Sequence, residues 1–121
     1  MIFVARTNIP VSLAGIQAAT TVPMMICHSV LQTFDYDLAI TSITDGHKQG
    51  VGGLHPWGFG CDFQPAKWHA PPLDSVYFHP RDLADGKKIR DALKAALFLE
   101  CDLVLERTHY HLEVDVKKKF S

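Results

Sequence analysis

Residues 102–116 read DLVLERTHYHLEVDV, and this stretch decides the fold that we expect. Its first part, Asp102–Glu106, is a short and mainly apolar run, whereas His109–Val116 alternates polar and apolar residues. Alternation with a period of two is typical of a half-buried strand, and the two segments are close enough in sequence to form a hairpin. We therefore expect two paired antiparallel strands here.

The second of these strands has two chemically different faces, because successive side chains point to opposite sides of a sheet. One face is apolar and is expected to join the core: Tyr110, Leu112 and Val114. The other face carries a line of ionisable groups: His109, His111 and Glu113. Neighbours on this line are about 7 Å apart at a rise of about 3.3 Å per residue. One imidazole can then bind a metal ion while the next acts as an acid or a base.

The rest of the chain predicts an α+β fold. Strands are expected at Met1–Ala5, Tyr36–Ser42 and Phe59–Phe63, and helices at about residues 22–34 and 86–99. Residues 44–58 and Pro65–Pro80 are rich in glycine or proline and are expected to be loops. We expect two helices packed on a small, mostly antiparallel sheet, and 121 residues correspond to one domain, residues 1–121.

Both helices are expected to be amphipathic. In the first, Thr21 and Pro23 suit a helix start, and five apolar residues recur at helical spacing: Val22, Met25, Ile26, Val30 and Phe34. In the second, Asp82 or Asp85 can cap the helix, and an apolar face is formed by Ile89, Leu93, Ala96 and Leu97. The charged side chains of this helix are expected to be largely solvated: Lys87, Lys88, Arg90, Asp91 and Lys94.

Composition narrows the class of protein. A formal net charge of −1 does not favour binding to nucleic acid or to an anionic membrane. Three cysteines without a CxxC pair predict reduced, buried thiols rather than a disulfide framework. The sequence predicts neither a signal peptide nor a membrane span, so we expect a protein that is cytoplasmic on synthesis. A target outside the cell would then require export or delivery by a virion.

A second motif lies at Gly53–Asp62, which reads GLHPWGFGCD. It contains His55 and Asp62, and its glycines let the backbone pass close to a bound group. With an imidazole from His109 or His111, these two residues make three nitrogen and oxygen ligands and leave a fourth position for water. Zn²⁺ in such a site lowers the pKa of its water towards about 7. If the two motifs meet in space, they predict a metallohydrolase.

The combination of motifs resembles zinc D-Ala-D-Ala carboxypeptidases and endolysin-type peptidases, which share the hedgehog/DD-peptidase fold. That family carries S-x-H-x-x-G-x-A-x-D followed by a C-terminal H-x-H or E-x-x-H, and this chain is similar to a small phage-encoded member. The family's T-S-x-x-D-G segment matches Thr41–Gly46, and its end resembles Val104–Asp115. The resemblance covers about residues 22–116.

The resemblance implies a zinc peptidase that cleaves peptidoglycan stem peptides at a D-amino acid bond. It makes His55, Asp62 and His111 the zinc ligands and His109 the group that transfers a proton. Members with E-x-x-H use the glutamate as general base, which would instead pair Glu106 with His109 as a ligand. We favour the first assignment, with Glu106 as a second candidate base.

Two departures from the family pattern concern the substrate. Gly53 stands in place of the family's serine, and the upstream arginine that steadies the substrate carbonyl has no clear equivalent, so Lys48 or His47 is the candidate substitute. A second hypothesis is a catalytically inactive, metal-stabilised binding module or virion component on the same fold. A third is an ordinary α+β domain with incidental histidines.

Overall fold

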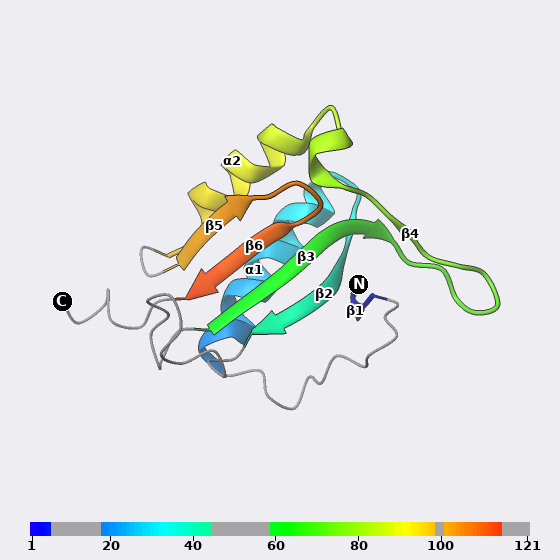
Figure 1. The fold of residues 1–121 in the computed structure, drawn as a ribbon, viewed down its shortest axis with the longest axis horizontal. Helices are drawn as coiled ribbons and strands as arrows, with labels where there is room; N and C mark the ends of the chain where they lie inside the picture. The colour runs from blue at the N-terminus through cyan, green and yellow to red at the C-terminus, as the bar shows by residue number, and fades with distance from the viewer. Residues whose placement is uncertain (6–17, 45–58, 99–100, 115–121) are drawn as a thin grey trace.

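The computed structural model describes residues 1–5, 18–44, 59–98 and 101–114. They form one mixed sheet of six strands, with two α-helices packed on one of its faces (Figure 1). The elements follow one another as β1 (Ile2–Val4), α1 (Ala18–Thr33), β2 (Asp37–Thr44), β3 (Phe59–Lys67), β4 (Val76–Tyr77), the 3₁₀ helix η1 (Pro80–Asp82), α2 (Gly86–Ala96), β5 (Cys101–Leu105) and β6 (Tyr110–Val114). The predicted α+β class with two helices is confirmed.

The strands lie in the order β1-β2-β3-β6-β5, and β4 pairs with the far end of β3. Only β1 and β2 are parallel, so the sheet is mostly antiparallel, as expected. The predicted hairpin is β5–β6, in which Leu105 lies opposite Tyr110. β6 also pairs with β3 and therefore lies inside the sheet rather than at its edge.

The core lies between the sheet and the two helices, and β6 contributes to it as predicted. Tyr110 and Leu112 are fully buried and Val114 is 3% exposed, whereas His111 and Glu113 lie on the opposite sheet face. The two helices contribute Met24, Cys27, Leu31, Ile89 and Leu93. The ring of Tyr110 packs against Phe63 of β3, with centroids 5.4 Å apart. The alternation of β6 therefore separates an apolar core from a polar face.

Helix α1 differs from its prediction in its start and in its buried face. It begins at Ala18 rather than near residue 22, and Pro23 lies inside it. The buried side chains include Met24, Cys27 and Leu31, while Val22 and Met25, expected in the core, are about half exposed. The pattern was ambiguous because apolar residues occur around most of this helix. Packing against the sheet therefore determines which face of α1 is buried.

The expectation of a loop from Pro65 to Pro80 is wrong at both ends. β3 continues to Lys67, β4 lies within the segment, and η1 begins at Pro80. A proline normally removes a hydrogen bond from a sheet. Here the carbonyl oxygen of Pro65 accepts the N–H of Phe78 at 3.0 Å, so the backbone polar groups of Pro65 face away from β2. Its missing N–H therefore interrupts no β2–β3 hydrogen bond.

The cysteines and helices agree with a compact α+β domain. Cys27 and Cys61 are buried, Cys101 is partly buried, and no disulfide joins these three described residues. Burial raises the pKa of the Cys27 thiol to about 12. In the part of the chain that the structure describes, no helix is long and apolar enough to cross a membrane.

Gly86, the first residue of α2, is where η1, α2 and β6 meet. A Cβ atom at this position would overlap the carbonyl oxygen of Pro80 in η1. The carbonyl oxygen of Gly86 accepts the hydroxyl of Tyr110 at 2.9 Å. Burial raises the pKa of Tyr110, so its hydroxyl stays protonated and able to donate. This buried hydrogen bond joins α2 to the central strand.

Replacing Tyr110→Phe is expected to lower the free energy of unfolding by about 1–3 kcal/mol, because the Gly86 carbonyl would remain buried without its partner. Urea denaturation measures the change. Tyr36→Phe is the matched control, since the Tyr36 hydroxyl has no hydrogen-bond partner among the described residues and its ring contact with Phe78 is retained. Equal stability of the Tyr110→Phe and Tyr36→Phe variants would contradict the expectation.

Candidate functional site

Asp62 of β3 and His111 of β6 lie directly opposite each other in the sheet. The neighbours of Asp62, Cys61 and Phe63, point into the core, so strand alternation places the Asp62 side chain on the face away from the helices. Nδ1 of His111 lies 2.6 Å from Oδ1 of Asp62. The antiparallel register therefore forms a close imidazole–carboxylate pair from two residues 49 positions apart.

His109 and Glu106 join this pair from the turn between β5 and β6. The backbone N–H of Glu106 donates to the carbonyl oxygen of His109 at 2.9 Å and closes the hairpin. Nε2 of His109 lies 3.0 Å from Oε2 of Glu106 and 3.4 Å from Oδ2 of Asp62. Asp62 therefore has one carboxylate oxygen beside each of the two histidines.

The turn is held against β3 by polar contacts. Nδ1 of His109 lies 2.9 Å from the Thr108 hydroxyl, and the Gln64 side-chain amide donates to the Thr108 carbonyl at 2.6 Å. These contacts fix both ends of the His109 imidazole, because its Nε2 already faces two carboxylates. The turn thus orients a side chain that lies just outside the regular strand.

A third carboxylate completes the arrangement. Oε2 of Glu113 lies 3.5 Å from Nε2 of His111, on the side of the ring opposite Asp62. We call the five residues the His–carboxylate cluster: Asp62, Glu106, His109, His111 and Glu113. Their side chains are between 22% and 45% exposed. The cluster is therefore partly exposed to solvent and partly shielded from it.

The cluster changes the proton affinity of His111. The hydrogen bond to Asp62 is the largest cause of a raised pKa for this imidazole, and the negative charges of Glu106 and Glu113 act in the same direction. Partial burial opposes these effects by disfavouring the charged ring. His111 consequently holds its proton to higher pH than an isolated histidine does.

The structure brings together four of the predicted site residues, namely Asp62, Glu106, His109 and His111. The other three, His47, Lys48 and His55, lie outside the described residues. Both imidazoles are close to Asp62, so either can be its partner at a metal ion, although His111 is closer and directly opposite.

Sequence reasoning assigned no role to Gln64 or Thr108. Neither residue type signals a site, and Gln64 reaches Thr108 only because β3 and the hairpin are neighbours in the sheet. Glu113 was correctly placed on the ionisable face by strand alternation, but its position beside His111 required the side-chain geometry.

Some residues of the His–carboxylate cluster are suitable ligands for a divalent transition metal ion. Asp62 and His111 supply the oxygen and nitrogen ligands that Zn²⁺ prefers, and Glu113 stands at the far nitrogen of His111 as carboxylates often do behind metal-binding histidines. Within residues 1–5, 18–44, 59–98 and 101–114, no group of three or more His, Cys, Asp or Glu residues is arranged to hold a metal ion. A zinc site would therefore need a ligand such as His55 from elsewhere in the chain.

No known protein family, curated protein or solved structure matches this chain. The likeness to zinc D-Ala-D-Ala peptidases thus depends on the quoted motifs alone. Any function must be argued from those residues and from the geometry of the His–carboxylate cluster.

In the metal-free protein, we expect His111 to titrate above its ordinary pKa of 6.5 and Asp62→Asn to lower that pKa. The folded state binds this proton more tightly than the unfolded chain, so its stabilising effect is complete below about pH 6.5 and is lost as the pH rises through the raised pKa. NMR titration of the imidazole resonances measures both values. Asp91→Asn, on the exposed side of α2, is the control and should leave His111 unchanged.

Proposed function

We propose that this chain is a zinc-dependent peptidase, a hydrolase that cleaves peptidoglycan stem peptides at a D-amino acid bond. One observation carries the proposal: Asp62 and His111 are in contact, and His109 with Glu106 lies beside them on the same sheet face. These are the residue types that the resemblance assigns to metal binding and to proton transfer. The proposed fold is of the hedgehog/DD-peptidase type, which the α+β architecture permits.

In this proposal Asp62 and His111 hold the metal together with His55. Zinc, when bound by such ligands, supplies a water molecule of lowered pKa and an electrophile for the peptide carbonyl. The Nδ1 atom of His111 faces Asp62 and is the candidate ligand atom, while Nε2 is oriented by Glu113. Glu113 would hold the imidazole ring in place, as second carboxylates do at many zinc sites.

His109 and Glu106 are the proposed proton-transfer pair. Nε2 of His109 and Oε2 of Glu106 are 3.0 Å apart, close enough to share a proton. The pair would accept the proton of the attacking water and deliver it to the amine that leaves. The short contact also keeps the second assignment open, with His109 as ligand and Glu106 as base. His47 or Lys48 would contact the substrate.

The proposal predicts chelator-sensitive hydrolysis of a D-Ala-D-Ala peptide or an L-Ala-D-Glu peptide. His111→Ala should lose both bound zinc and activity, because it removes a ligand. Glu106→Gln should retain zinc and reduce kcat by about 10²–10⁴-fold, the range for loss of a general acid or base. Metal analysis of the purified variants and hydrolysis of both peptides, followed by mass spectrometry, make the comparison.

His69→Ala is the matched control, because His69 is an exposed histidine that contacts Ser75 and Asp74 rather than the cluster. It should retain zinc and full activity. Bound zinc with no hydrolysis of any stem peptide would favour a metal-stabilised binding or virion module instead. Absence of both zinc and a thermal shift on adding Zn²⁺ would exclude the metal site.

A further inference from the structure

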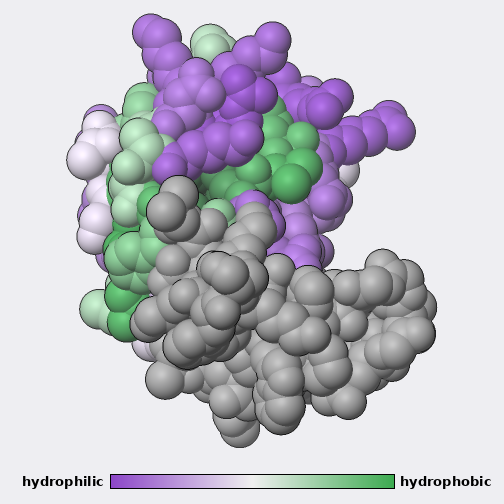
Figure 2. Space-filling view, turned by 90° about the vertical axis from the view of Figure 1, so that its left-hand side faces the viewer, coloured by the Kyte–Doolittle hydropathy of each residue, from purple (hydrophilic) through white to green (hydrophobic). Residues whose placement is uncertain are grey.

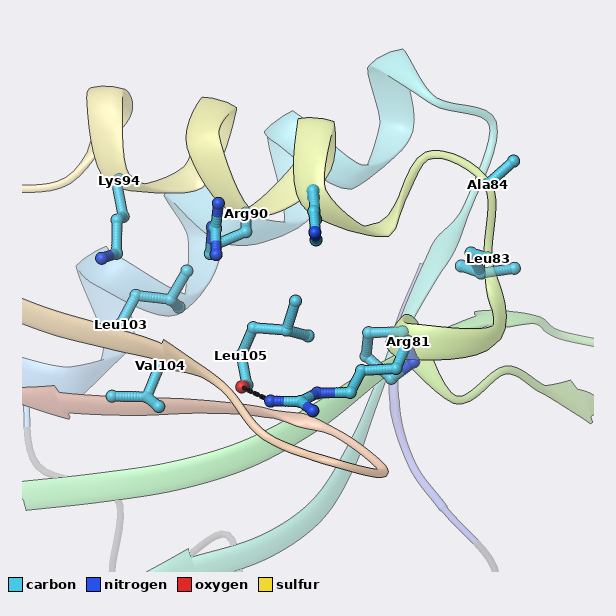
Figure 3. Close-up of a pocket in the computed structure, with 10 residues that line it drawn as sticks. Arg81, Leu83, Ala84, Arg90, Lys94, Leu103, Val104 and Leu105 are labelled. Atoms are coloured by element: carbon cyan, nitrogen blue, oxygen red, sulfur yellow. Dashed lines mark hydrogen bonds between the residues drawn. The ribbon is translucent and has the colours of Figure 1, made fainter.

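A basic hollow lies between α2 and β5, at the edge of the sheet. Its volume is about 610 Å³, and we call it the cationic groove (Figure 3). Among the residues that the structure describes, ten line it, of which four are cationic and none is acidic: Arg81, Lys87, Arg90 and Lys94 carry the charge. Leu103, Val104 and Leu105 of β5 form its apolar wall. Figure 2, which views the molecule from the left-hand side of Figure 1, shows hydrophilic side chains gathered beside apolar surface.

The cations form a row because of their spacing on the helix. Lys87, Arg90 and Lys94 are separated by three and four residues, which places them on one face of α2. At 1.5 Å per residue the row extends about 10 Å along the helix axis. In Figure 3 the side chains of Arg90 and Lys94 are directed from α2 towards β5. The positive charges are therefore spread along the groove rather than concentrated at one position.

Arg81 closes one end of this row. It belongs to η1, and its guanidinium lies along β5, where it donates to the carbonyl oxygen of Leu105 at 3.5 Å (Figure 3). Within the described part of the chain this is its only hydrogen bond, which leaves other N–H groups of the guanidinium available to a ligand. Three elements of the fold thus contribute to the groove: η1, α2 and β5.

One nearby acid contacts a groove cation, but no acid lines the groove among the described residues. Asp91 accepts from Nε of Arg90 at 3.1 Å but does not line the hollow, and Asp82 lies 3.7 Å from His79. A cleft with charges of one sign and an apolar wall concentrates its electric field and attracts ions of the opposite sign. The cations lining the groove thus make this hollow locally positive although the whole chain has a net charge of −1.

We propose that the cationic groove binds a ligand that carries two or more phosphate groups in a row. A row of about 10 Å matches several adjacent charges better than one. The N–H groups of Arg81 and Arg90 suit phosphate oxygens, with which guanidinium groups form paired hydrogen bonds. A hollow of 610 Å³ is also within the usual range for small-molecule sites, about 300–1,000 Å³.

This inference is independent of the proposed peptidase function. None of the groove residues belongs to the His–carboxylate cluster. The two sites are nevertheless close, because Val104 lines the groove and lies opposite His111 in the β5–β6 pair. β5 and β6 are about 5 Å apart in the plane of the sheet, and the cluster lies on the sheet face away from the helices.

The test is calorimetric titration with inorganic phosphate, tripolyphosphate and a glycerol phosphate oligomer, all at the same ionic strength. Tripolyphosphate should bind at least about tenfold more tightly than inorganic phosphate, because only a row of charges can engage several cations. The double variant Lys87→Gln/Lys94→Gln should weaken that binding about tenfold. Lys88→Gln is the matched control, since Lys88 is an exposed lysine of the same helix outside the groove.

The three probes also separate the possible sources of the phosphates. Preference for the glycerol phosphate oligomer would support a phosphodiester chain, and preference for tripolyphosphate would support a free oligophosphate. The proposal is overturned if no phosphate probe binds at millimolar concentration, or if Lys88→Gln weakens binding as much as the double variant. Tighter binding of a triglutamate peptide than of tripolyphosphate would overturn it as well. All variants change exposed side chains, and circular dichroism verifies their folding.

Discussion

The antiparallel pairing of β3 with β6 is the constraint on which the rest of the structure depends. It joins the strands β1 and β2 to the β5–β6 hairpin and so makes one sheet from the two ends of the described chain. On the helix side the same pairing packs Phe63 against Tyr110. On the other side it places Asp62 opposite His111. A slip of one residue would move every one of these side chains to the wrong face, so burial of the core also fixes the polar cluster.

The two candidate sites use the fold in different ways. The His–carboxylate cluster is formed by the polar face of the sheet, where neighbouring strands bring acids and imidazoles within 2.6–3.5 Å of one another. The cationic groove forms at the sheet edge, where a helix lies beside β5 and no further strand is paired to it within the described residues. One site therefore brings carboxylates next to imidazoles. The other brings together cationic side chains from η1 and α2, with no acid among its described lining residues.

The local sequence pattern predicted an element well where only one of its faces could be buried. In β6 the apolar residues Tyr110, Leu112 and Val114 alternate with polar ones, and only one face could be buried. In α1 apolar residues occur on most sides, so Met24 and Leu31 were buried and Met25 was left exposed by the position of the sheet. Pro65 indicated a loop, yet it lies in a strand because its missing N–H faces away from β2.

By itself, the sequence determined the α+β class, the β5–β6 hairpin and the two faces of β6, because each depends on spacing within a short segment. It also named Asp62, His109 and His111 as residues that belong together. Only the tertiary structure decided that Asp62 is shared by both imidazoles, since that depends on the register between strands far apart in sequence. The tertiary structure also decided that charged side chains of α2 line a groove, because Arg81 and the apolar wall of β5 come from other elements.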